Sequence, residues 1–334
     1  CVRFYPLGAP GGVNAADETI GQALARGHGD VPAVLCGDRT LSYRELDALA
    51  CRFGNGFRAA GIGVGDRVVL VLPDTPELMA AYLGAFKVGA VPIAFSTRAS
   101  AADLSYVIED SDCRLLMIEP DGASDLTVLC QVVTDAVAFA ADQPAELETA
   151  PMSPEDPAFW FYTSGTTGRP KGVVHLQRAV LSTQLHLEKN LSIGPGDRIF
   201  ATSKMFFAYP LGHYLGALRL GATIILHPDW PNAEGIAAVV DQFRPDLFLC
   251  VPTLYRNLLQ GGFTGGGFQS VRHFVSAGEK LPASLFDSWR DATGMPILEG
   301  IGTSETAVLF IANTPDNVCP GSTGRPPPWV EGRL

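Results

Sequence analysis

The most informative segment of the chain is Tyr162-Thr163-Ser164-Gly165-Thr166-Thr167-Gly168-Arg169-Pro170-Lys171-Gly172. It lies between two apolar runs, 159–162 and 173–174, that the pattern predicts as strands. Glycine lets backbone amides approach an anion closely, and serine and threonine add hydroxyl donors. Lys171 adds a mobile positive charge suited to phosphate oxygens. The segment therefore predicts a phosphate-binding loop between two strands.

Three better-known loops are excluded by the spacing. A P-loop needs G-x-x-x-x-G-K-[ST], but Lys171 lies between Pro170 and Gly172. The sequence has no G-x-G-x-x-G for a dinucleotide and no G-x-S-x-G nucleophile elbow. A flexible surface loop is the alternative, and it leaves Lys171 and the two flanking strands unexplained.

Outward from this loop, apolar runs alternate with helical patterns along the chain. The apolar runs do not alternate with polar residues, which is typical of buried parallel strands covered by helices. Expected strands are 68–72, 90–94, 115–118, 222–226, 247–251 and 273–276, and expected helices are 42–60, 77–88, 101–110, 179–191, 233–243, 252–259 and 282–293. The irregular segment 121–157 predicts a boundary between two α/β subdomains, 1–157 and 158–334.

Composition excludes several classes of protein. The 334 residues include 24 Lys and Arg against 35 Asp and Glu, a net charge of −11, which argues against a nucleic-acid binder. No run approaches the length of a membrane span, and the first residues lack a secretory signal. The seven cysteines include no closely spaced pair, which predicts reduced thiols in a cytoplasmic protein and no zinc site. The sequence leaves open whether the protein forms a homodimer.

Two further segments accompany the loop in a recognisable order: Ser276-Ala277-Gly278-Glu279-Lys280-Leu281 and Gly300-Ile301-Gly302-Thr303-Ser304-Glu305. Together the three segments resemble the acyl-adenylate-forming enzymes, which include acyl-CoA synthetases, peptide-synthetase adenylation domains and luciferases. Ile301 replaces the aromatic residue common in that family, and Ser304 takes the position of a threonine. The loss of the aromatic residue removes one expected wall of the adenine site.

Short blocks spread over most of the chain resemble benzoate–CoA ligase and related aryl-CoA ligases. They include Asn14-Ala15-Ala16-Asp17, Val91-Pro92-Ile93-Ala94, Trp160-Phe161-Tyr162, Phe206-Phe207-Ala208-Tyr209 and Gly321-Ser322-Thr323-Gly324-Arg325-Pro326. The resemblance implies two stacked, largely parallel α/β subdomains of the N-terminal domain. Family members continue with a β-barrel lobe and a C-terminal domain, which have no counterpart here, so we expect a fragment that adenylates poorly by itself.

The resemblance also implies a reaction in two steps. A carboxylate attacks the α-phosphorus of ATP to give an acyl-adenylate and pyrophosphate, and the thiol of coenzyme A then displaces AMP. Lys171, Ser304 and Glu305 are the expected catalytic residues, with Glu305 holding Mg²⁺ because this hard cation prefers carboxylate oxygen.

Three groups of binding residues follow from the same resemblance. Phosphate contacts are expected from Thr163, Ser164, Gly165, Thr166, Thr167, Gly168, Lys171 and Thr303. Adenosine contacts are expected from Gly278, Glu279, Lys280, Glu299, Gly300, Ile301 and Gly302. The acid pocket is expected from Phe207, Ala208, Tyr209, Ala277, Gly302 and Val308.

Val308 departs from the benzoate-specific pattern, which has a histidine at the aligned position. The change favours an apolar or differently substituted acid. His175 and His213 are interpreted as structural. Three functions remain: an aryl-acid–CoA ligase using ATP, Mg²⁺ and coenzyme A, an adenylation domain that loads a carrier-protein thiol, and a non-catalytic nucleotide-binding module.

Overall fold

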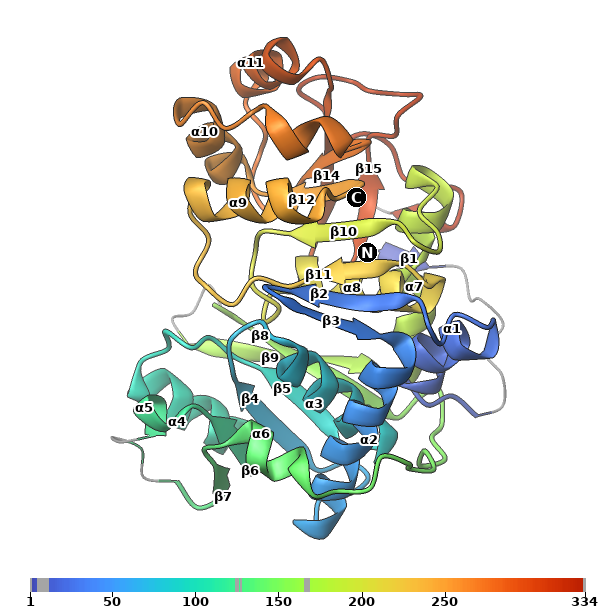
Figure 1. Ribbon diagram of the computed structural model, residues 1–334, viewed down its shortest axis with the longest axis vertical. Helices are drawn as coiled ribbons and strands as arrows, with labels where there is room; N and C mark the ends of the chain where they lie inside the picture. The colour runs from blue at the N-terminus through green and yellow to red at the C-terminus, as the bar shows by residue number, and fades with distance from the viewer. Residues whose placement is uncertain (1, 5–11, 124–125, 127, 165–168, 333–334) are drawn as a thin grey trace. The chain divides into compact units, whose positions relative to one another are not determined.

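A computed structural model describes residues 2–4, 12–123, 126, 128–164 and 169–332 (Figure 1). The chain divides into two compact units. Unit 1 comprises Cys1–Leu7, Val31–Thr40 and Leu181–Leu334, and unit 2 comprises Gly8–Asp30 and Leu41–Val180. In the part of the chain that the structure describes, every helix is too short or too polar to cross a membrane.

Unit 2 contains a parallel four-stranded sheet in the order β5-β4-β6-β7 and a separate antiparallel hairpin, β8–β9. Its strands are β4 (Arg67–Val71), β5 (Val91–Ala94), β6 (Cys113–Ile118), β7 (Gln131–Val133), β8 (Pro157–Ser164) and β9 (Pro170–Leu176). Its helices are η1 (Asp17–Gly21), α1 (Gln22–Ala25), α2 (Tyr43–Ala59), α3 (Pro76–Lys87), α4 (Ala101–Asp110), α5 (Pro120–Ala123), α6 (Ala136–Ala141) and η2 (Gln177–Ala179), with α7 (Val180–Thr183) at the unit boundary.

The start of α2 shows how local sequence sets these elements. The Ser42 hydroxyl accepts the backbone amide of Glu45 at 3.2 Å, and the Glu45 carboxylate accepts the amide of Ser42 at 2.8 Å. This capping box satisfies two amides that the first helical turn leaves free. The helix ends at Ala59, and Gly61 supplies a positive φ of 76° just beyond it. The Ser-x-x-Glu spacing of Ser42 and Glu45, the sequence pattern of a capping box, therefore forms one in the structure.

Unit 1 is built on an eight-stranded sheet in the order β15-β14-β13-β12-β10-β11-β2-β3, in which β14–β13–β12–β10–β11–β2 pair in parallel. Its strands are β2 (Pro32–Cys36), β3 (Arg39–Ser42, which continues into unit 2), β10 (Arg198–Ala201), β11 (Thr223–Ile225), β12 (Leu247–Cys250), β13 (His273–Ser276), β14 (Ile297–Gly302) and β15 (Leu309–Ala312), with β1 (Val2–Phe4) and β16 (Val330–Gly332) as a separate pair. Its helices are η3 (His186–Asn190), α8 (Ala208–Leu220), α9 (Ala233–Phe243), α10 (Pro252–Gln260), η4 (Gly266–Ser270) and α11 (Ala283–Thr293).

One face of this sheet is covered by α9, α10 and α11. The core between them centres on Trp289, with Phe248 and Phe274 from the strands and Tyr255 from α10. The Trp289 ring lies 4.7 Å from the ring of Tyr255 and 5.1 Å from that of Phe274. Aromatic pairs at these distances add to the free energy gained from burial. The predicted α/β class with mostly parallel sheets is confirmed.

Candidate active site

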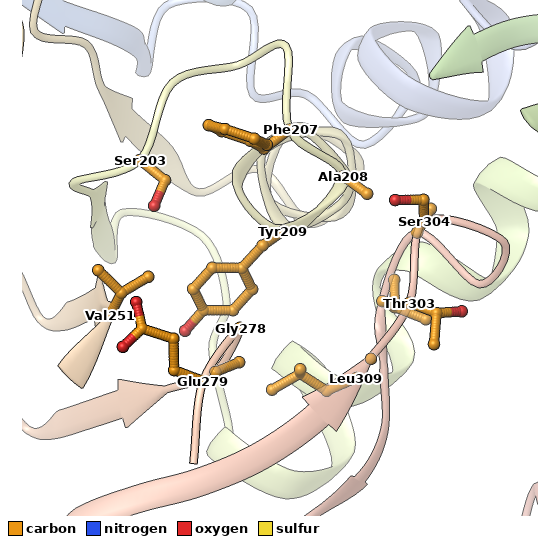
Figure 2. A pocket seen from close by; sticks show the side chains of 14 residues that line it. Ser203, Phe207, Ala208, Tyr209, Val251, Gly278, Glu279, Thr303, Ser304 and Leu309 are labelled. Carbon is orange, nitrogen blue, oxygen red and sulfur yellow. The ribbon is translucent and has the colours of Figure 1, made fainter. Parts of the chain in front are cut away.

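A cavity of about 350 Å³ opens at the carboxyl ends of the parallel strands of unit 1 (Figure 2). It is lined by Ser203, Phe207, Ala208, Tyr209, Val251, Ala277, Gly278, Glu279, Gly302, Thr303, Ser304, Ala307, Val308 and Leu309. Strand register explains why these segments meet. Ser276 lies between Cys250 and Glu299 in adjacent strands, so the residues that follow leave the sheet at one edge.

The strand order explains why the cavity forms at this point of the edge. From β10 the chain moves to β11 on one side, and after α9 it enters β12 on the other side of β10. Because parallel crossovers are right-handed, the helices after β10 and β12 cover opposite faces of the sheet. Their connecting segments diverge and leave a crevice, which is the usual ligand site of an open α/β sheet.

The start of α8 supplies one wall of the cavity. Phe207 is the residue before the helix, is 52% exposed, and packs on Phe206 with ring centroids 4.2 Å apart. The Tyr209 ring points toward Val251 and Glu279 (Figure 2), and its hydroxyl donates to the Val275 carbonyl at 3.3 Å. Burial raises the pKa of Tyr209 well above its ordinary value, so this wall is a neutral phenol.

The opposite wall is the segment 302–309. The Thr306 hydroxyl donates to the Val308 carbonyl at 2.9 Å and accepts the Thr303 amide at 3.1 Å, which fixes the turn. Ala307 has a φ of 57°, a conformation that alanine rarely adopts. A Cβ built on Gly212 of α8 would lie 1.8 Å from the Ala307 carbonyl oxygen. The absence of a side chain at Gly212 therefore lets this wall approach α8.

The residues expected around adenosine are divided by the structure. Gly278, Glu279 and Gly302 line the cavity, and the Glu279 carboxylate accepts the Thr253 hydroxyl at 3.1 Å. The Glu299 side chain is 3% exposed and accepts the Leu281 amide at 3.0 Å. The other expected residues stand outside the lining: Lys280, which is exposed, Gly300 within β14, and Ile301, which is 41% exposed.

Thr303 and Ser304 line the cavity, and Glu305 follows them as an exposed residue of the same turn. Within the described residues, no group of three or more His, Cys, Asp or Glu side chains could hold a metal ion. Mg²⁺ keeps several waters and is commonly bound by one or two carboxylates together with substrate phosphates. A single exposed carboxylate such as Glu305 fits that mode of binding, with phosphate oxygens and water as the remaining ligands.

The hydroxyl-rich segment belongs to unit 2, where β8 and β9 form the antiparallel hairpin on either side of it. Thr163 pairs directly with Lys171, so both side chains lie on one face of the hairpin. Lys171 is exposed, and Ser164 pairs with Pro170 through the backbone. The remaining expected phosphate contacts, Gly165, Thr166, Thr167 and Gly168, lie outside the described residues.

Two side chains of α4 hold the loop end of this hairpin, and neither is among the residues expected from the sequence. The Tyr162 hydroxyl donates to Asp110 at 2.6 Å, and the Tyr106 hydroxyl donates to the other oxygen of the same carboxylate at 3.2 Å. The Arg169 guanidinium lies 5.3 Å from the centre of the Tyr106 ring. Burial, and secondarily Asp110, raises the pKa of Tyr162, so its hydroxyl stays a donor. The signal was available as an i, i+4 Tyr–Asp pair on a predicted helix.

Four further lining residues were also missed: Ser203, Val251, Ala307 and Leu309. Val251 directly follows β12, and Ser203 lies two residues after β10. Residues that follow parallel strands are candidates for a ligand site at that edge. The predicted strand 247–251 includes Val251 as its last residue, so this rule finds Val251 only with the observed end of β12 at Cys250.

The histidines interpreted as structural are indeed packed in cores. His175 stacks on Phe159 in unit 2, with ring centroids 4.7 Å apart. In unit 1, His213 Nδ1 lies 2.6 Å from the Tyr209 carbonyl oxygen, and the His213 ring meets that of His186 at 5.8 Å. Burial lowers the pKa of His213 to about 4 and, with a smaller contribution from His213, lowers that of His186 to about 3. Both are neutral at neutral pH.

Residues 22–334 match the family described as AMP-binding enzyme. The chain is 47% identical over 342 aligned residues to a 3-hydroxybenzoate–CoA ligase of Aromatoleum sp. (strain CIB), with 97% of this chain and 65% of the relative covered. It is 33% identical to a benzoate–CoA ligase of Thauera aromatica, with 96% and 64% covered. The chain thus spans about 65% of the length of these curated relatives.

Two solved structures of CoA ligases also match the fold of this chain. The anthranilate CoA ligase AuaEII in complex with anthranoyl-AMP matches with a TM-score of 0.88 at 29% identity, covering 95% of this chain and 65% of that one. A benzoate CoA ligase from Burkholderia xenovorans LB400 matches with a TM-score of 0.86 at 30% identity, covering 95% and 66%. The fold, the order of the three segments and the sequence match agree, and the chain belongs to the AMP-binding enzyme family.

Proposed function

We propose that this chain is the acid- and nucleotide-binding part of an ATP-dependent carboxylate–CoA ligase acting on benzoate-like aromatic acids. The reaction would join the acid to AMP with release of pyrophosphate, and coenzyme A would then displace AMP to give the thioester. The observation that carries the proposal is the cavity at the carboxyl edge of unit 1. This cavity brings together residues from three stretches that are distant in the sequence, namely Phe207–Tyr209, Ala277–Glu279 and Gly302–Ser304.

The character of this cavity supports a compact aromatic acid. At about 350 Å³ it lies at the small end of ligand pockets. Aromatic and aliphatic side chains face each other across it, with Tyr209 on one side and Val308 and Leu309 on the other. A flat ring would be held by such walls, and its carboxylate would be directed toward the polar turn at Thr303 and Ser304. Because a 3-hydroxybenzoate–CoA ligase is among the similar proteins, 3-hydroxybenzoate is the first acid to test.

In this proposal the hairpin of unit 2 binds the phosphates. Lys171 and Thr163 would offer an ammonium group and a hydroxyl from one face of the hairpin, and Ser164, Gly165, Thr166, Thr167 and Gly168 would add amides and hydroxyls. Fixed donors stabilise charge that develops on phosphate oxygens during transfer. Asp110 would act indirectly, by fixing Tyr162 next to Thr163.

Glu305 would hold Mg²⁺, which when bound supplies positive charge to the phosphates of ATP. Thr303 and Ser304 precede Glu305 in the same turn and would contact the phosphates directly. Gly278, Glu279, Lys280, Glu299, Gly300, Ile301 and Gly302 remain the proposed adenosine contacts. The buried Glu299 would contribute through the position of the Leu281 backbone.

The test is acid-dependent exchange of labelled pyrophosphate into ATP, measured on the full-length enzyme with a panel of benzoic acids. We expect exchange with 3-hydroxybenzoate or a near analogue, followed by thioester formation when coenzyme A is added. Lys171→Ala should slow exchange while sparing thioester formation from preformed acyl-adenylate. Exchange that is independent of every acid in the panel, or equal loss of both steps in Lys171→Ala, would contradict the proposal.

A further inference from the structure

A second and larger cavity lies entirely within unit 2, apart from the hairpin. It has a volume of about 630 Å³ and is bordered by the end of α4, the start of β6 and the segment that enters β7. Two cysteines line it, Cys113 at the first position of β6 and Cys130 just before β7. The proposed ligase reaction uses neither thiol.

The strand register explains why the two thiols face the same side of the sheet. Leu116 pairs with Val132 in parallel, and Cys130 lies two residues before Val132, on the same face. An irregularity where β6 pairs with β4 lets Cys113 join Leu116 in the apolar cluster under α4. Cys130 packs against that same cluster. Adjacent strands are about 4.8 Å apart, so two thiols on one face at their ends come within reach of each other.

The two thiols differ in character. Cys113 is 7% exposed and Cys130 is half-buried at the cavity. The neighbouring Cys113 thiol lowers the pKa of Cys130 to about 7, and the same interaction together with burial raises that of Cys113. The Cys113 thiol also donates to the Leu115 carbonyl at 3.1 Å. Arg114, Glu109 and Asp112 also border the cavity, but the shift of the Cys130 pKa arises from Cys113, burial and backbone amides and not from these charges. Cys130 therefore holds a larger fraction of thiolate at neutral pH than an ordinary cysteine does.

We propose that Cys113 and Cys130 form a modification site, a thiol pair that a small hydroperoxide entering this cavity converts reversibly to a disulfide. The Cys130 thiolate attacks the peroxide oxygen and, with one proton taken up, gives a sulfenic acid and water. The Cys113 thiol then attacks the Cys130 sulfur, forming the S–S bond and releasing a second water. Hydrogen peroxide is thereby reduced by two electrons and the two thiols are oxidised by two. A dithiol reductant reverses the step.

The other described cysteines provide internal comparisons. Cys250 is fully buried, and burial raises its pKa to about 12. Burial also raises the pKa of Cys51. Cys319 is the exposed thiol among them, and it lies in unit 1, away from the pair in sequence and unit. Exposure alone would favour oxidation at Cys319, whereas the thiol pair favours Cys130.

The experiment treats the purified 334-residue chain with sub-stoichiometric to equimolar hydrogen peroxide at pH 7 and maps its peptides without reduction. We expect a cross-linked peptide joining Cys113 to Cys130, loss of two of the seven titratable thiols, and recovery of both with dithiothreitol. In Cys113→Ser the resolving thiol is missing, so Cys130 should accumulate as a sulfenic acid trapped by dimedone. Cys319→Ser, the matched control, should give the same cross-link as the unmodified sequence.

Two results would overturn the proposal. One is oxidation that reaches Cys319 first or joins any other pair, which would mean that exposure decides reactivity. The other is dimedone labelling of Cys130 in the unmodified sequence that equals labelling in Cys113→Ser, which would mean that Cys113 does not resolve the intermediate. If Cys113→Ser fails to fold, alkylation of Cys130 against pH in the unmodified chain serves instead. A midpoint near 7 supports the pair, and a midpoint near 8.5 refutes it.

Discussion

The contact between Gly212 and Ala307 provides the sharpest test of how the proposed acid pocket is held. Substituting Gly212→Ala adds a Cβ that would lie 1.8 Å from the Ala307 carbonyl oxygen. Carbon and oxygen atoms without a bond between them normally stay more than about 3 Å apart, and cores resist such overpacking. The segment 302–309 must therefore move away from α8 by more than about 1 Å. Val308 and Leu309, which line the cavity, would move with it.

The size of the effect follows from two opposing contributions. Overpacking of this kind costs about 3 kcal/mol, and alanine gains about 1 kcal/mol over glycine within a helix. A net loss of about 2 kcal/mol corresponds to a melting temperature lower by about 4–8 °C. In the full-length enzyme the displaced wall should raise KM for the acid more than KM for ATP, because a misplacement of about 1 Å weakens a fitted site.

The assay compares thermal unfolding and the two KM values of Gly212→Ala with those of Gly194→Ala. Gly194 lies in unit 1, and a Cβ there would meet nothing within 4 Å. The control should therefore change the free energy of unfolding by no more than about 0.5 kcal/mol. If Gly212→Ala melts with the control and keeps the same KM for the acid, the wall is not supported by α8 and the reasoning is refuted.

Three further predictions concern the hairpin, the metal and pH. Tyr162→Phe removes a hydrogen bond to the exposed Asp110 that is worth about 1 kcal/mol. This variant should raise KM for ATP about fivefold and leave KM for the acid unchanged. Equal rises in the two KM values would argue for general destabilisation. Glu305→Gln should slow adenylation on the order of a hundredfold and weaken its magnesium dependence, and an unchanged magnesium titration would remove Glu305 from the site. Buried His186 and His213 have pKa values of about 3 and 4, lowered from 6.5, so they stabilise the fold fully above pH 6.5 and lose that contribution as pH falls toward 4. At pH 5 urea unfolding should show a loss of about 4 kcal/mol relative to pH 7 that the double variant His186→Gln/His213→Gln lacks.

Much of the fold could be predicted because buried parallel strands are apolar throughout. The runs at 68–72, 115–118 and 247–251 correspond to β4, β6 and β12. β14 escaped prediction because Glu299, Gly300 and Gly302 give it the composition of a turn. Gly302 is required by the close approach of the segment that enters β15, since a Cβ on Gly302 would lie 2.5 Å from the Val308 carbonyl oxygen. The subdomain boundary at 157 stays a prediction.

Residue type alone indicates chemistry for the hydroxyls and lysine of the hairpin, and their phosphate role stays a prediction. Contacts that join distant segments could not be predicted from the sequence. The bond between Tyr162 and Asp110 spans 52 positions, and the approach of Ala307 to Gly212 joins a loop to a helix nearly a hundred residues earlier. Neither is visible in local periodicity, since both depend on how the sheets bring separate segments together.

The cavity of unit 1 takes its walls from four connections that follow different strands, namely β10, β12, β13 and β14. The lining residues of these connections lie outside the paired positions of the parallel strands beneath. A replacement in one wall can therefore reshape the space offered to a ring substituent while the supporting scaffold keeps its register. Because the lining residues lie on connections and not at the paired positions of the parallel strands, replacements in a single connection can adapt this fold to acids with different ring substituents.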